Sequence, residues 1–454
     1  MSSNSIHARA ALLDDGWAEN VRLVLDGGVI SGVEAGVEAH AEDERVDHLV
    51  PAMGNHHSHA FQRAMSGLAE KRGQGTDTFW TWRDVMYRFA LAMNPDQMEA
   101  VAAQLYVEMV EAGFCRVGEF HYLHNDRDGL PYANRGEMSE RIVAAAGEAG
   151  IGLTLLPAFY AHSNFGGLAP NDGQRRFIND LAGFEDLLAR CRDMAATHHG
   201  VSVGVAPHSL RAVTPQELDA LVAMAGDDPI HIHVAEQEKE VADCLEWCGQ
   251  RPLEWLLAHA PVNERWCLIH STHLTGDELD GIVHAGATVG LCPVTEGNLG
   301  DGVFPAADLL RNGGRFGIGT DSNVSVGVAG ELRQLEYSQR LAQRQRSVVA
   351  RQGWSSGRVL FSEARRGGQA ALNFSVDIEQ GAPATFVTFD SASVPWLSRD
   401  SLLDAWIFGD ALRPDGVWID GRQMVAEGRH VAAGPVAERF RRTMTELLRE
   451  TGLQ

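Results

Sequence analysis

The stretch HLVPAMGNHHSH, residues 48–59, begins with an apolar run and ends in two histidines separated by one serine. The run from His48 to Met53 is typical of a β-strand, and His57 and His59 follow it. In an extended chain, residues two apart point to the same side, so both imidazoles can face one metal ion. His56 would then point away, and we interpret it as structural. The pair predicts a metal site only if further ligands follow other strands.

Seven more short apolar runs recur along the middle of the chain, each followed by polar residues and an amphipathic stretch. Eight alternating β and α units favour a (β/α)8 barrel, in which catalytic side chains lie at the carboxyl ends of the strands. The further runs that we expect to be strands are Cys115–Phe120, Gly152–Leu156, Val201–Ala206, Ile230–Val234, Cys267–His270, Thr288–Leu291 and Phe316–Gly319. The helices expected between them include 96–111, 139–149, 183–196, 215–225 and 329–346.

Both ends of the chain are rich in β-strand signals. Val21–Leu25 and Val29–Val33 flank a turn and predict a hairpin, and Gly416–Ile419 and Gln423–Ala426 do the same near the other end. We therefore predict an α/β protein, a TIM-like (β/α)8 barrel with a small β-sandwich domain formed from the N- and C-terminal segments. The predicted divisions are 1–48 and 376–435 for the small domain, 49–375 for the barrel and 436–454 for a C-terminal helix.

The charge balance excludes two classes of partner. The chain carries 38 Lys and Arg against 61 Asp and Glu, a formal net charge of −23, which disfavours nucleic acid and anionic membrane surfaces.

The chain has no run of about 18 apolar residues that could span a membrane, and Met1 to Ala11 lacks the apolar core of a signal peptide. Six cysteines are too sparse for a disulfide scaffold. We expect a cytoplasmic protein.

Histidines and carboxylates follow several predicted strands, where a barrel places its active site. His233 lies in the fifth strand and Asp321 follows the eighth. With His57 and His59 they offer three nitrogens and one oxygen, a set that suits zinc or iron(II) and leaves a position for water. The other polar residues that follow strands are His121, Tyr122, His208, Arg211, Glu236 and His270.

These motifs resemble the amidohydrolase superfamily, in the order found in its metal-dependent deaminases. The resemblance rests on Met53-Gly-Asn-His-His-Ser-His59, His231-Ile-His233-Val-Ala-Glu236, His270-Ser-Thr-His273 and Gly319-Thr-Asp321-Ser322. Binuclear members of the superfamily bridge two metals with a carboxylated lysine on the fourth strand. The fourth run here has none, and the two lysines of the chain, Lys71 and Lys239, lie elsewhere. We therefore expect one metal ion per subunit.

The resemblance and ordinary chemistry together assign roles to the polar residues. A divalent ion lowers the pKa of a bound water towards 7, and Asp321, as ligand and acceptor, can take the water proton. His270 is placed by the resemblance to orient or polarise the nucleophile. Glu236, three residues beyond His233, can carry a proton to the leaving nitrogen. The predicted catalytic residues are Glu236, His270 and Asp321, and the predicted metal ligands are His57, His59, His233 and Asp321.

Residues outside the metal set indicate the substrate. Two arginines near the mouth of a barrel, in so acidic a chain, favour a bidentate grip on carboxylate. The residues that we expect to bind substrate are Gln62, Arg83, Tyr122, His208 and Arg211.

The stretches around these residues resemble the formimidoylglutamate deiminases of histidine degradation. The matching stretches are Asn55–Met65, Thr81–Tyr87, Ala206–Val213 and Cys292–Gly302, the last of which we expect to be a glycine-rich loop. His56 departs from the pattern, where an apolar residue is expected. The resemblance implies zinc, a homodimer, and hydrolysis of N-formimino-L-glutamate to N-formyl-L-glutamate and ammonia.

Two alternatives remain open from the sequence. A deaminase of the same superfamily could act on another amidine, guanidine or ring amine, and would not need Arg83 and Arg211. A catalytically silent barrel could bind metal or ligand only, although Glu236, His270 and Asp321 are all present.

Overall fold

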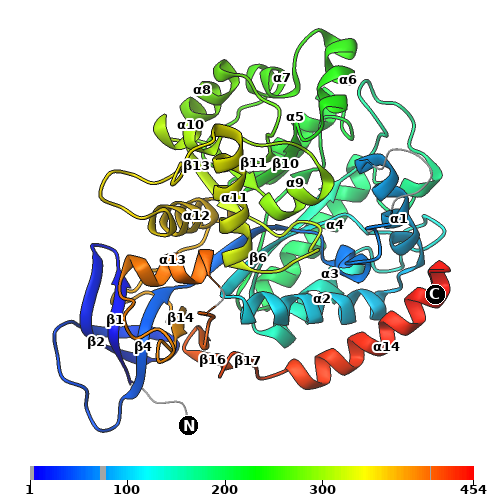
Figure 1. Cartoon of the computed structure of the whole chain (residues 1–454). Coiled ribbons are helices and arrows are strands. Elements are labelled where there is room, and N and C mark those ends of the chain that lie inside the picture. Colours follow the sequence, from blue (N-terminus) through cyan, green and yellow to red (C-terminus); the bar gives the residue numbers. More distant parts are fainter. Residues whose placement is uncertain (1–4, 72–77, 410, 454) are drawn as a thin grey trace.

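The computed structural model describes residues 5–71, 78–409 and 411–453, and it shows a helix-wrapped barrel beside a smaller sheet (Figure 1). The barrel strands are all parallel and form two hydrogen-bonded runs, β5-β6-β7-β8 with β9 beside β7, and β10-β11-β12-β13. Bridges between Val205 and Ile230 and between Ser58 and Asp321 join the two runs. The barrel strands are β5 Met53–Ser58, β6 Phe114–His121, β7 Gly152–Phe159, β8 Val201–Val203, β9 Ala206–Pro207, β10 Ile230–Val234, β11 Trp266–His270, β12 Thr288–Leu291 and β13 Arg315–Ile318.

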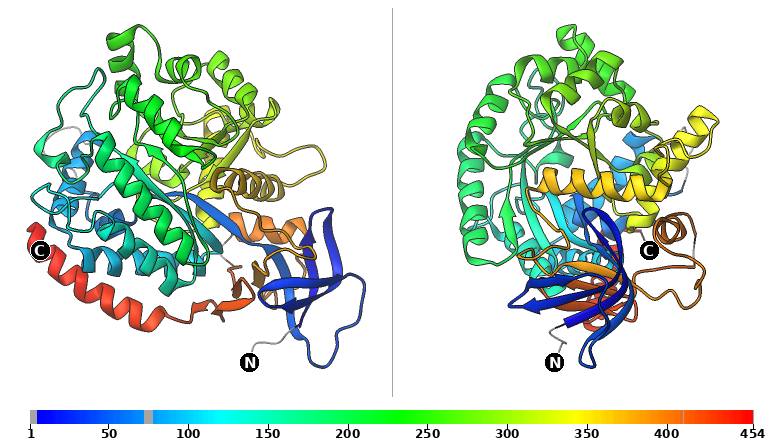
Figure 2. Two further views of the ribbon diagram at one scale, coloured as in Figure 1. Left: turned by 180° about the vertical axis from the view of Figure 1, so that it is seen from behind. Right: turned by 90° about the vertical axis from the view of Figure 1, so that its left-hand side faces the viewer.

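Helices surround the barrel, as expected of βα units (Figure 2). They turn buried apolar faces towards the strands, and side chains such as Met98, Leu187 and Leu221 are almost fully buried. The predicted (β/α)8 barrel is therefore confirmed. The helices are α1 Phe79–Ala92, α2 Pro95–Glu111, α3 Glu137–Ala149, α4 Leu181–Thr197, α5 Pro215–Ala225, α6 Glu238–Cys248, α7 Pro252–His259, α8 Gly276–Ala285, α9 Pro293–Leu299, α10 Ala306–Arg311, α11 Val328–Gln343, α12 Ser356–Leu372, α13 Asp400–Phe408 and α14 Ala433–Thr451, with 3-10 turns η1 Ala60–Met65 and η2 Asp172–Gln174.

The two ends of the chain meet in one eight-stranded sheet, in the order β17-β16-β15-β14-β4-β1-β2-β3. Its core includes Ile6, Leu23, Leu49, Phe386 and Trp418. Both predicted hairpins are present, as β2–β3 and β15–β16. The strands are β1 Ser5–Leu13, β2 Gly16–Asp26, β3 Val29–Glu34, β4 Glu44–Pro51, β14 Phe386–Phe389, β15 Gly416–Ile419, β16 Arg422–Ala426 and β17 Arg429–His430.

The division of the chain at 48/49, 375/376 and 435/436 stays a prediction. Part of it, residues 1–4, 72–77, 410 and 454, lies outside the described residues. The helix expected near the C-terminus is present as α14, and it packs along α2 and α1 on the outside of the barrel (Figures 1 and 2). Among the described residues, no helix is long and apolar enough to cross a membrane.

The first predicted strand was wrong in its bounds. Up to Pro51 the chain pairs with β1 and β14 in the small sheet, and only from Met53 does it pair with β6 in the barrel. The apolar run therefore belongs to two strands of two sheets. One consequence is that His57 lies inside β5, and His59 directly follows it.

The stretch expected to be a glycine-rich loop was also predicted wrongly, because Pro293–Leu299 forms helix α9. Proline is favourable in the first helical turn, since its missing N–H has no partner there in any case. Gly300, with φ 71°, ends the helix in the left-handed conformation that glycine adopts easily. Proline and glycine thus mark the two ends of a short helix here.

Helix α12 lies very close to the barrel, and glycine makes this possible. A Cβ atom at Gly367 would overlap the carbonyl oxygen of Phe316 in β13. We expect Gly367→Ala to lower the free energy of unfolding by about 1–3 kcal/mol or more, because backbone atoms would have to move. Gly330→Ala in α11 is the matched control, since its Cβ would meet nothing within 4 Å. Thermal unfolding of both variants measures the difference, and equal midpoints would contradict the packing described here.

Candidate active site

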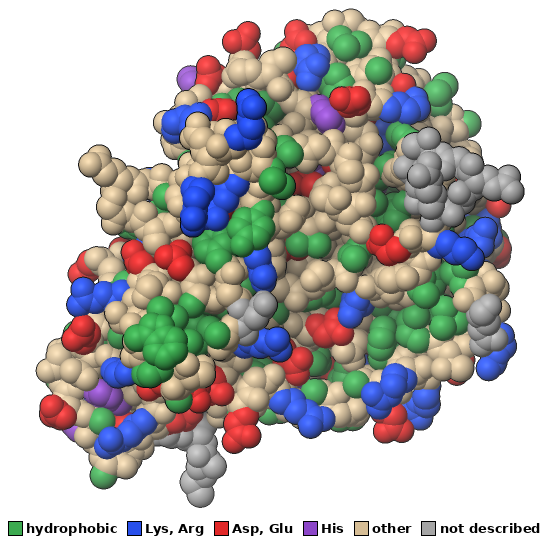
Figure 3. Space-filling view, viewed as in Figure 1, with side chains coloured by type: hydrophobic (Ala, Val, Ile, Leu, Met, Phe, Trp, Pro, Cys, Tyr) green, Lys and Arg blue, Asp and Glu red, His purple; other side chains and the backbone are tan. Residues whose placement is uncertain are grey.

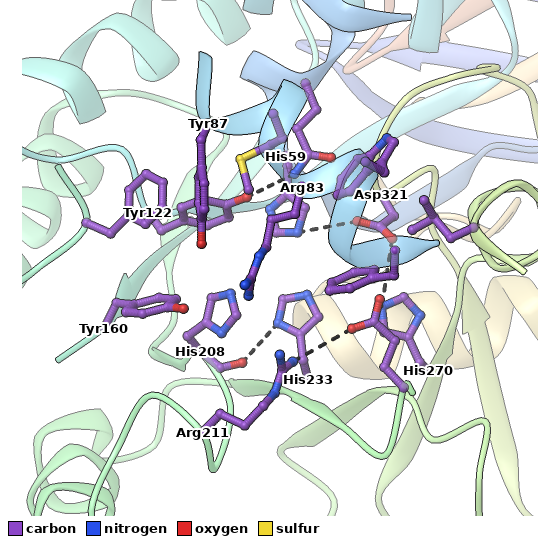
Figure 4. A pocket seen from close by; sticks show the side chains of 17 residues that line it. His59, Arg83, Tyr87, Tyr122, Tyr160, His208, Arg211, His233, His270 and Asp321 are labelled. Carbon is purple, nitrogen blue, oxygen red and sulfur yellow. Dashed lines mark hydrogen bonds and ion pairs between the residues drawn. The ribbon is translucent and has the colours of Figure 1, made fainter. Parts of the chain in front are cut away.

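A cleft of about 570 Å³ opens at the carboxyl ends of the barrel strands (Figure 4). It brings together every residue that the sequence predicted to bind substrate, together with all three predicted catalytic residues. His57 lies beneath the cleft and is fully buried. The lining residues are His59, Gln62, Phe79, Trp82, Arg83, Met86, Tyr87, Tyr122, Tyr160, Phe177, His208, Arg211, His233, Glu236, His270, Leu299 and Asp321.

Three histidines converge at the floor of the cleft. The Nε2 atom of His57 lies 3.2 Å from Nε2 of His59 and 3.1 Å from Nε2 of His233. Oδ1 of Asp321 lies 3.3 Å from the His59 nitrogen and 3.5 Å from the His57 nitrogen. The four predicted ligands therefore lie within one small space. They come from β5, the residue after it, β10 and the segment that follows β13.

This arrangement fits a tetrahedral metal ion. Nδ1 of His59 lies 2.8 Å from the Phe120 carbonyl oxygen and Nδ1 of His233 lies 2.9 Å from that of His208. Each Nδ1 therefore carries the proton, and the Nε2 lone pairs face one another, which favours a cation between them. Ligand atoms about 2.0–2.1 Å from zinc are separated by roughly 3.3–3.4 Å, close to the separations found here.

Burial keeps these imidazoles neutral. Desolvation lowers the pKa of His57 and His233 well below the ordinary value, and it also lowers that of His59. A neutral imidazole is the form that ligates metal. The residues present thus meet both the geometric and the protonation requirements of a three-histidine, one-carboxylate site.

The backbone at the strand ends takes an unusual conformation to aim these side chains. Ala235, His270 and Asp321 have positive φ values of 53°, 67° and 46°. Such left-handed geometry costs free energy in residues other than glycine and collects at functional sites. Asn323 helps to hold it, since its amide donates to the Asp321 carbonyl oxygen at 2.8 Å.

Glu236 and His270 stand beside the metal ligands. Nε2 of His270 lies 3.7 Å from Oε1 of Glu236 and 3.8 Å from Oδ2 of Asp321. Burial raises the pKa of Glu236 above its ordinary value, although His270 and Arg211 act in the opposite direction. Burial by itself lowers the pKa of His270, but the surrounding carboxylates, Glu236 first, raise it to about 10. A carboxyl group with a raised pKa is suited to proton transfer near neutral pH.

The opposite wall of the cleft is cationic. Arg83 and Arg211 converge on it in Figure 4. The Arg83 guanidinium stacks on Trp80 at 4.6 Å from the ring centre and lies 5.5 Å from the Tyr87 ring. The Arg211 side chain is only 11% exposed, and its Nη2 lies 3.8 Å from Oε2 of Glu236. Neither Nε atom has a hydrogen-bond partner, so both guanidinium groups keep donors for an anionic ligand.

Gln62, Tyr122 and His208 complete this wall. The Gln62 amide donates to the Tyr122 hydroxyl at 2.9 Å, while its own carbonyl oxygen is buried without a partner. His208 meets the Tyr160 ring in a T-shaped contact with the ring centres 4.5 Å apart, and burial lowers the pKa of His208 well below the ordinary value. Tyr122 and His208 also make a T-shaped contact, with their ring centres 5.6 Å apart. The wall thus offers aromatic faces and spare polar atoms together.

Several lining residues were missed from the sequence. Tyr87, Met86 and Trp82 come from α1, which was not predicted, and Tyr160 and Phe177 come from segments after β7. The side chain of Thr81 accepts the Thr78 backbone N–H, a local signal that could have marked the start of α1. No local sequence pattern could have shown that this helix lines the cleft, because its position depends on tertiary contacts.

The remaining histidines of the motifs lie away from the ligand cluster. His56 is fully buried against Gly290 and Gly317, and both of its ring nitrogens lack hydrogen-bond partners. Burial lowers the pKa of His56 to about 3. Nε2 of His231 lies 2.8 Å from the Ala371 carbonyl oxygen. Both residues therefore fill the barrel interior as neutral groups.

Comparison with known proteins supports the same fold. The amidohydrolase family matches residues 48–424. The chain belongs to the amidohydrolase family. The N-terminal domain of formimidoylglutamate deiminase HutF matches residues 3–47, so the small sheet as well as the barrel matches a known family. The family resemblance predicted from the motifs is confirmed.

Two amidohydrolases are similar to the whole chain. Formimidoylglutamate deiminase from Pseudomonas aeruginosa is 46% identical over 455 residues, which cover 98% of this chain and all of that protein. The crystal structure of an amidohydrolase from Brucella melitensis is 55% identical, with a TM-score of 0.96, over 98% of this chain and 100% of that one. An adenosine deaminase from Xanthomonas campestris with bound zinc shares the fold, with a TM-score of 0.79 at 20% identity over 98% of each chain.

Proposed function

We propose that the protein hydrolyses N-formimino-L-glutamate to N-formyl-L-glutamate and ammonia in histidine degradation. The observation that carries the proposal is the polarity of the cleft. One end holds three converging imidazoles and a carboxylate, and the other holds Arg83 and Arg211. A substrate with a formimino group at one end and carboxylates at the other fits this polarity. The similarity to formimidoylglutamate deiminase supports the same substrate.

One zinc ion per subunit is part of the proposal. His57, His59, His233 and Asp321 would hold it, and iron(II) is the other ion that suits this donor set. When bound, the ion supplies a water of lowered pKa and positive charge to balance the developing negative charge. Metal analysis of the purified protein tests this, with one equivalent per chain expected. Two equivalents would contradict it.

The protein groups around the ligands perform the proton transfers. Asp321 accepts a proton from the attacking water, and His270, 3.8 Å from it, polarises the reacting oxygen. Glu236 donates a proton to the nitrogen that leaves as ammonia, from a position beside both His270 and Arg211. The C–O bond forms at the formimino carbon, and the bond to the terminal nitrogen breaks.

The arginine wall binds the glutamate portion in this proposal. Arg83 and Arg211 pair with its carboxylates, and Gln62, Tyr122 and His208 supply further hydrogen bonds. The face shown in Figure 3 mixes acidic and basic side chains. In this proposal the positive charge that a dianionic substrate needs comes from Arg83 and Arg211 in the cleft.

We extend the proposal to a homodimer in the cytoplasm. It is supported by the resemblance to the formimidoylglutamate deiminases. Light scattering on the purified protein should give a mass twice the 49.3 kDa of one chain. A mass of one chain would exclude the dimer, and fractionation of the source cells tests the compartment.

The function is tested by following products from zinc-loaded protein. Ammonia release from N-formimino-L-glutamate, with N-formyl-L-glutamate as the second product, is expected. A panel of other amidines and ring amines should give much lower kcat/KM. Formamide with free glutamate, or faster turnover of a neutral ring amine, would contradict the proposal.

A further inference from the structure

Behind His270 lies a carboxylate that the proposed reaction does not use. Glu296 stands in α9 and is only 5% exposed. Its Oε1 atom accepts the Cys292 backbone N–H at 2.8 Å and lies 3.3 Å from Nδ1 of His270. Nδ1 is the ring nitrogen that points away from the cleft, because Nε2 faces Glu236 and Asp321.

We propose that Glu296 is a positioning residue for His270. By accepting the Nδ1–H, it fixes the plane of the imidazole and keeps a proton on the rear nitrogen. Nε2 is then held towards the reacting atoms between Glu236 and Asp321. The inference rests on the proposed function for its kinetic consequence, but the hydrogen bond itself does not.

The hydrogen bonds that hold α9 in place make Glu296 suitable for this role. Oε2 of Glu331 accepts the Val294 backbone N–H at 2.9 Å, which ties the first turn of α9 to α11. Thr295 donates its hydroxyl to the Thr320 carbonyl oxygen at 3.2 Å, next to Asp321. Helix α9 is therefore hydrogen-bonded to the segment that carries the predicted metal ligand Asp321. A residue on a well-anchored helix keeps its side-chain geometry.

A purely structural role is the competing interpretation. Glu296 could merely close the turn at Cys292, since the same Oε1 atom accepts that N–H. In that case its loss would destabilise α9 without affecting the hydrogen bond at Nδ1 of His270. The two interpretations therefore differ in kcat and in whether Nδ1 of His270 is hydrogen-bonded.

The experiment compares Glu296→Ala and Glu296→Gln with the wild type. Alanine removes the acceptor, while glutamine keeps a carbonyl oxygen of the same reach. We expect Glu296→Ala to lower kcat by about 10- to 100-fold with KM and zinc content unchanged. Glu296→Gln should recover most of the lost kcat. Glu278→Gln is the matched control, a buried carboxyl that accepts the Thr275 backbone N–H at the start of α8 and does not contact His270, and it should keep wild-type kcat.

Nitrogen-15 NMR of the histidine rings supplies a readout independent of turnover, with the His270 signals assigned from a His270→Asn variant. In the wild type and in Glu296→Gln, Nδ1 should carry a proton. In Glu296→Ala the Nδ1 shift should move. Unchanged ring shifts, or unchanged kcat in Glu296→Ala, would overturn the inference. A wild type that releases no ammonia would sink the proposed function instead, while the ring shifts would still decide the hydrogen bond.

Discussion

Glu236→Gln is expected to lower kcat for ammonia release by about 10²- to 10⁴-fold, the range of a lost general acid–base. Glutamine preserves the size of the side chain but cannot give or take the proton. The predicted metal ligands are untouched, since the ion pairs of Glu236 are with His270 and Arg211. Zinc content should therefore stay at the wild-type value, and KM should change much less than kcat.

Glu238→Gln is the matched control for this variant. Glu238 begins α6, two residues after Glu236, and its side chain is exposed. The same chemical change there should leave kcat and zinc content unaltered. Turnover of Glu236→Gln close to the wild type would remove Glu236 as the proton carrier. Loss of zinc from it would show that the variant disturbs the metal site instead.

The candidate metal site could be predicted from the sequence because each part of it depends on a local pattern. Short apolar runs indicate strands such as β10 and β12, whose bounds match the prediction. Parallel strands of a barrel bring their carboxyl ends to one rim. His233 and Asp321, 88 residues apart in the chain, were therefore expected to meet without any knowledge of their contacts.

The parts that were missed depend on contacts between distant segments. The apolar run from His48 to Met53 is divided between two sheets, because its first half pairs with β1 and β14 in the small sheet. Helix α1 lines the cleft only through its tertiary position, and its aromatic residues are equally typical of an ordinary buried face. The contact of Glu296 with His270 could not be predicted, because it depends on the position of α9 in the fold. An acidic residue in a first helical turn is common and does not by itself indicate a functional role.

In the proposed function, the arginine wall lets an acidic protein bind an acidic substrate. Nη2 of Arg211 lies 3.8 Å from Glu236 and 3.9 Å from Glu240, while its Nε has no hydrogen-bond partner and remains a donor for a ligand. Arg83 has aromatic neighbours in Trp80 and Tyr87, and no ion pair of Arg83 is found among the described residues. The two guanidinium groups are therefore the main attraction for carboxylates in a chain whose net charge is −23.

Arg211→Met and Arg83→Met are each expected to lower kcat/KM for N-formimino-L-glutamate by about 10- to 150-fold, mainly through KM. This corresponds to the loss of a charged hydrogen bond of about 1.5–3 kcal/mol. Methionine keeps much of the apolar stem, so packing in the cleft should survive. Because the two side chains bind the same ligand, the effects of the double variant need not be additive.

Formamidine, which carries the reacting group without carboxylates, separates binding from chemistry in these variants. Its kcat/KM should be nearly the same in the wild type and in Arg83→Met, because Arg83 then has no carboxylate to hold. Arg211→Met also removes the charge beside Glu236, so part of its effect should remain with formamidine. Arg88→Met is the matched control, since Arg88 is exposed on the same helix as Arg83 and does not line the cleft. Equal losses for both substrates would mean that the arginines maintain the shape of the site. An unchanged KM for N-formimino-L-glutamate would mean that its carboxylates do not bind to these arginines. The cleft would then give no reason to prefer this substrate over a neutral amidine.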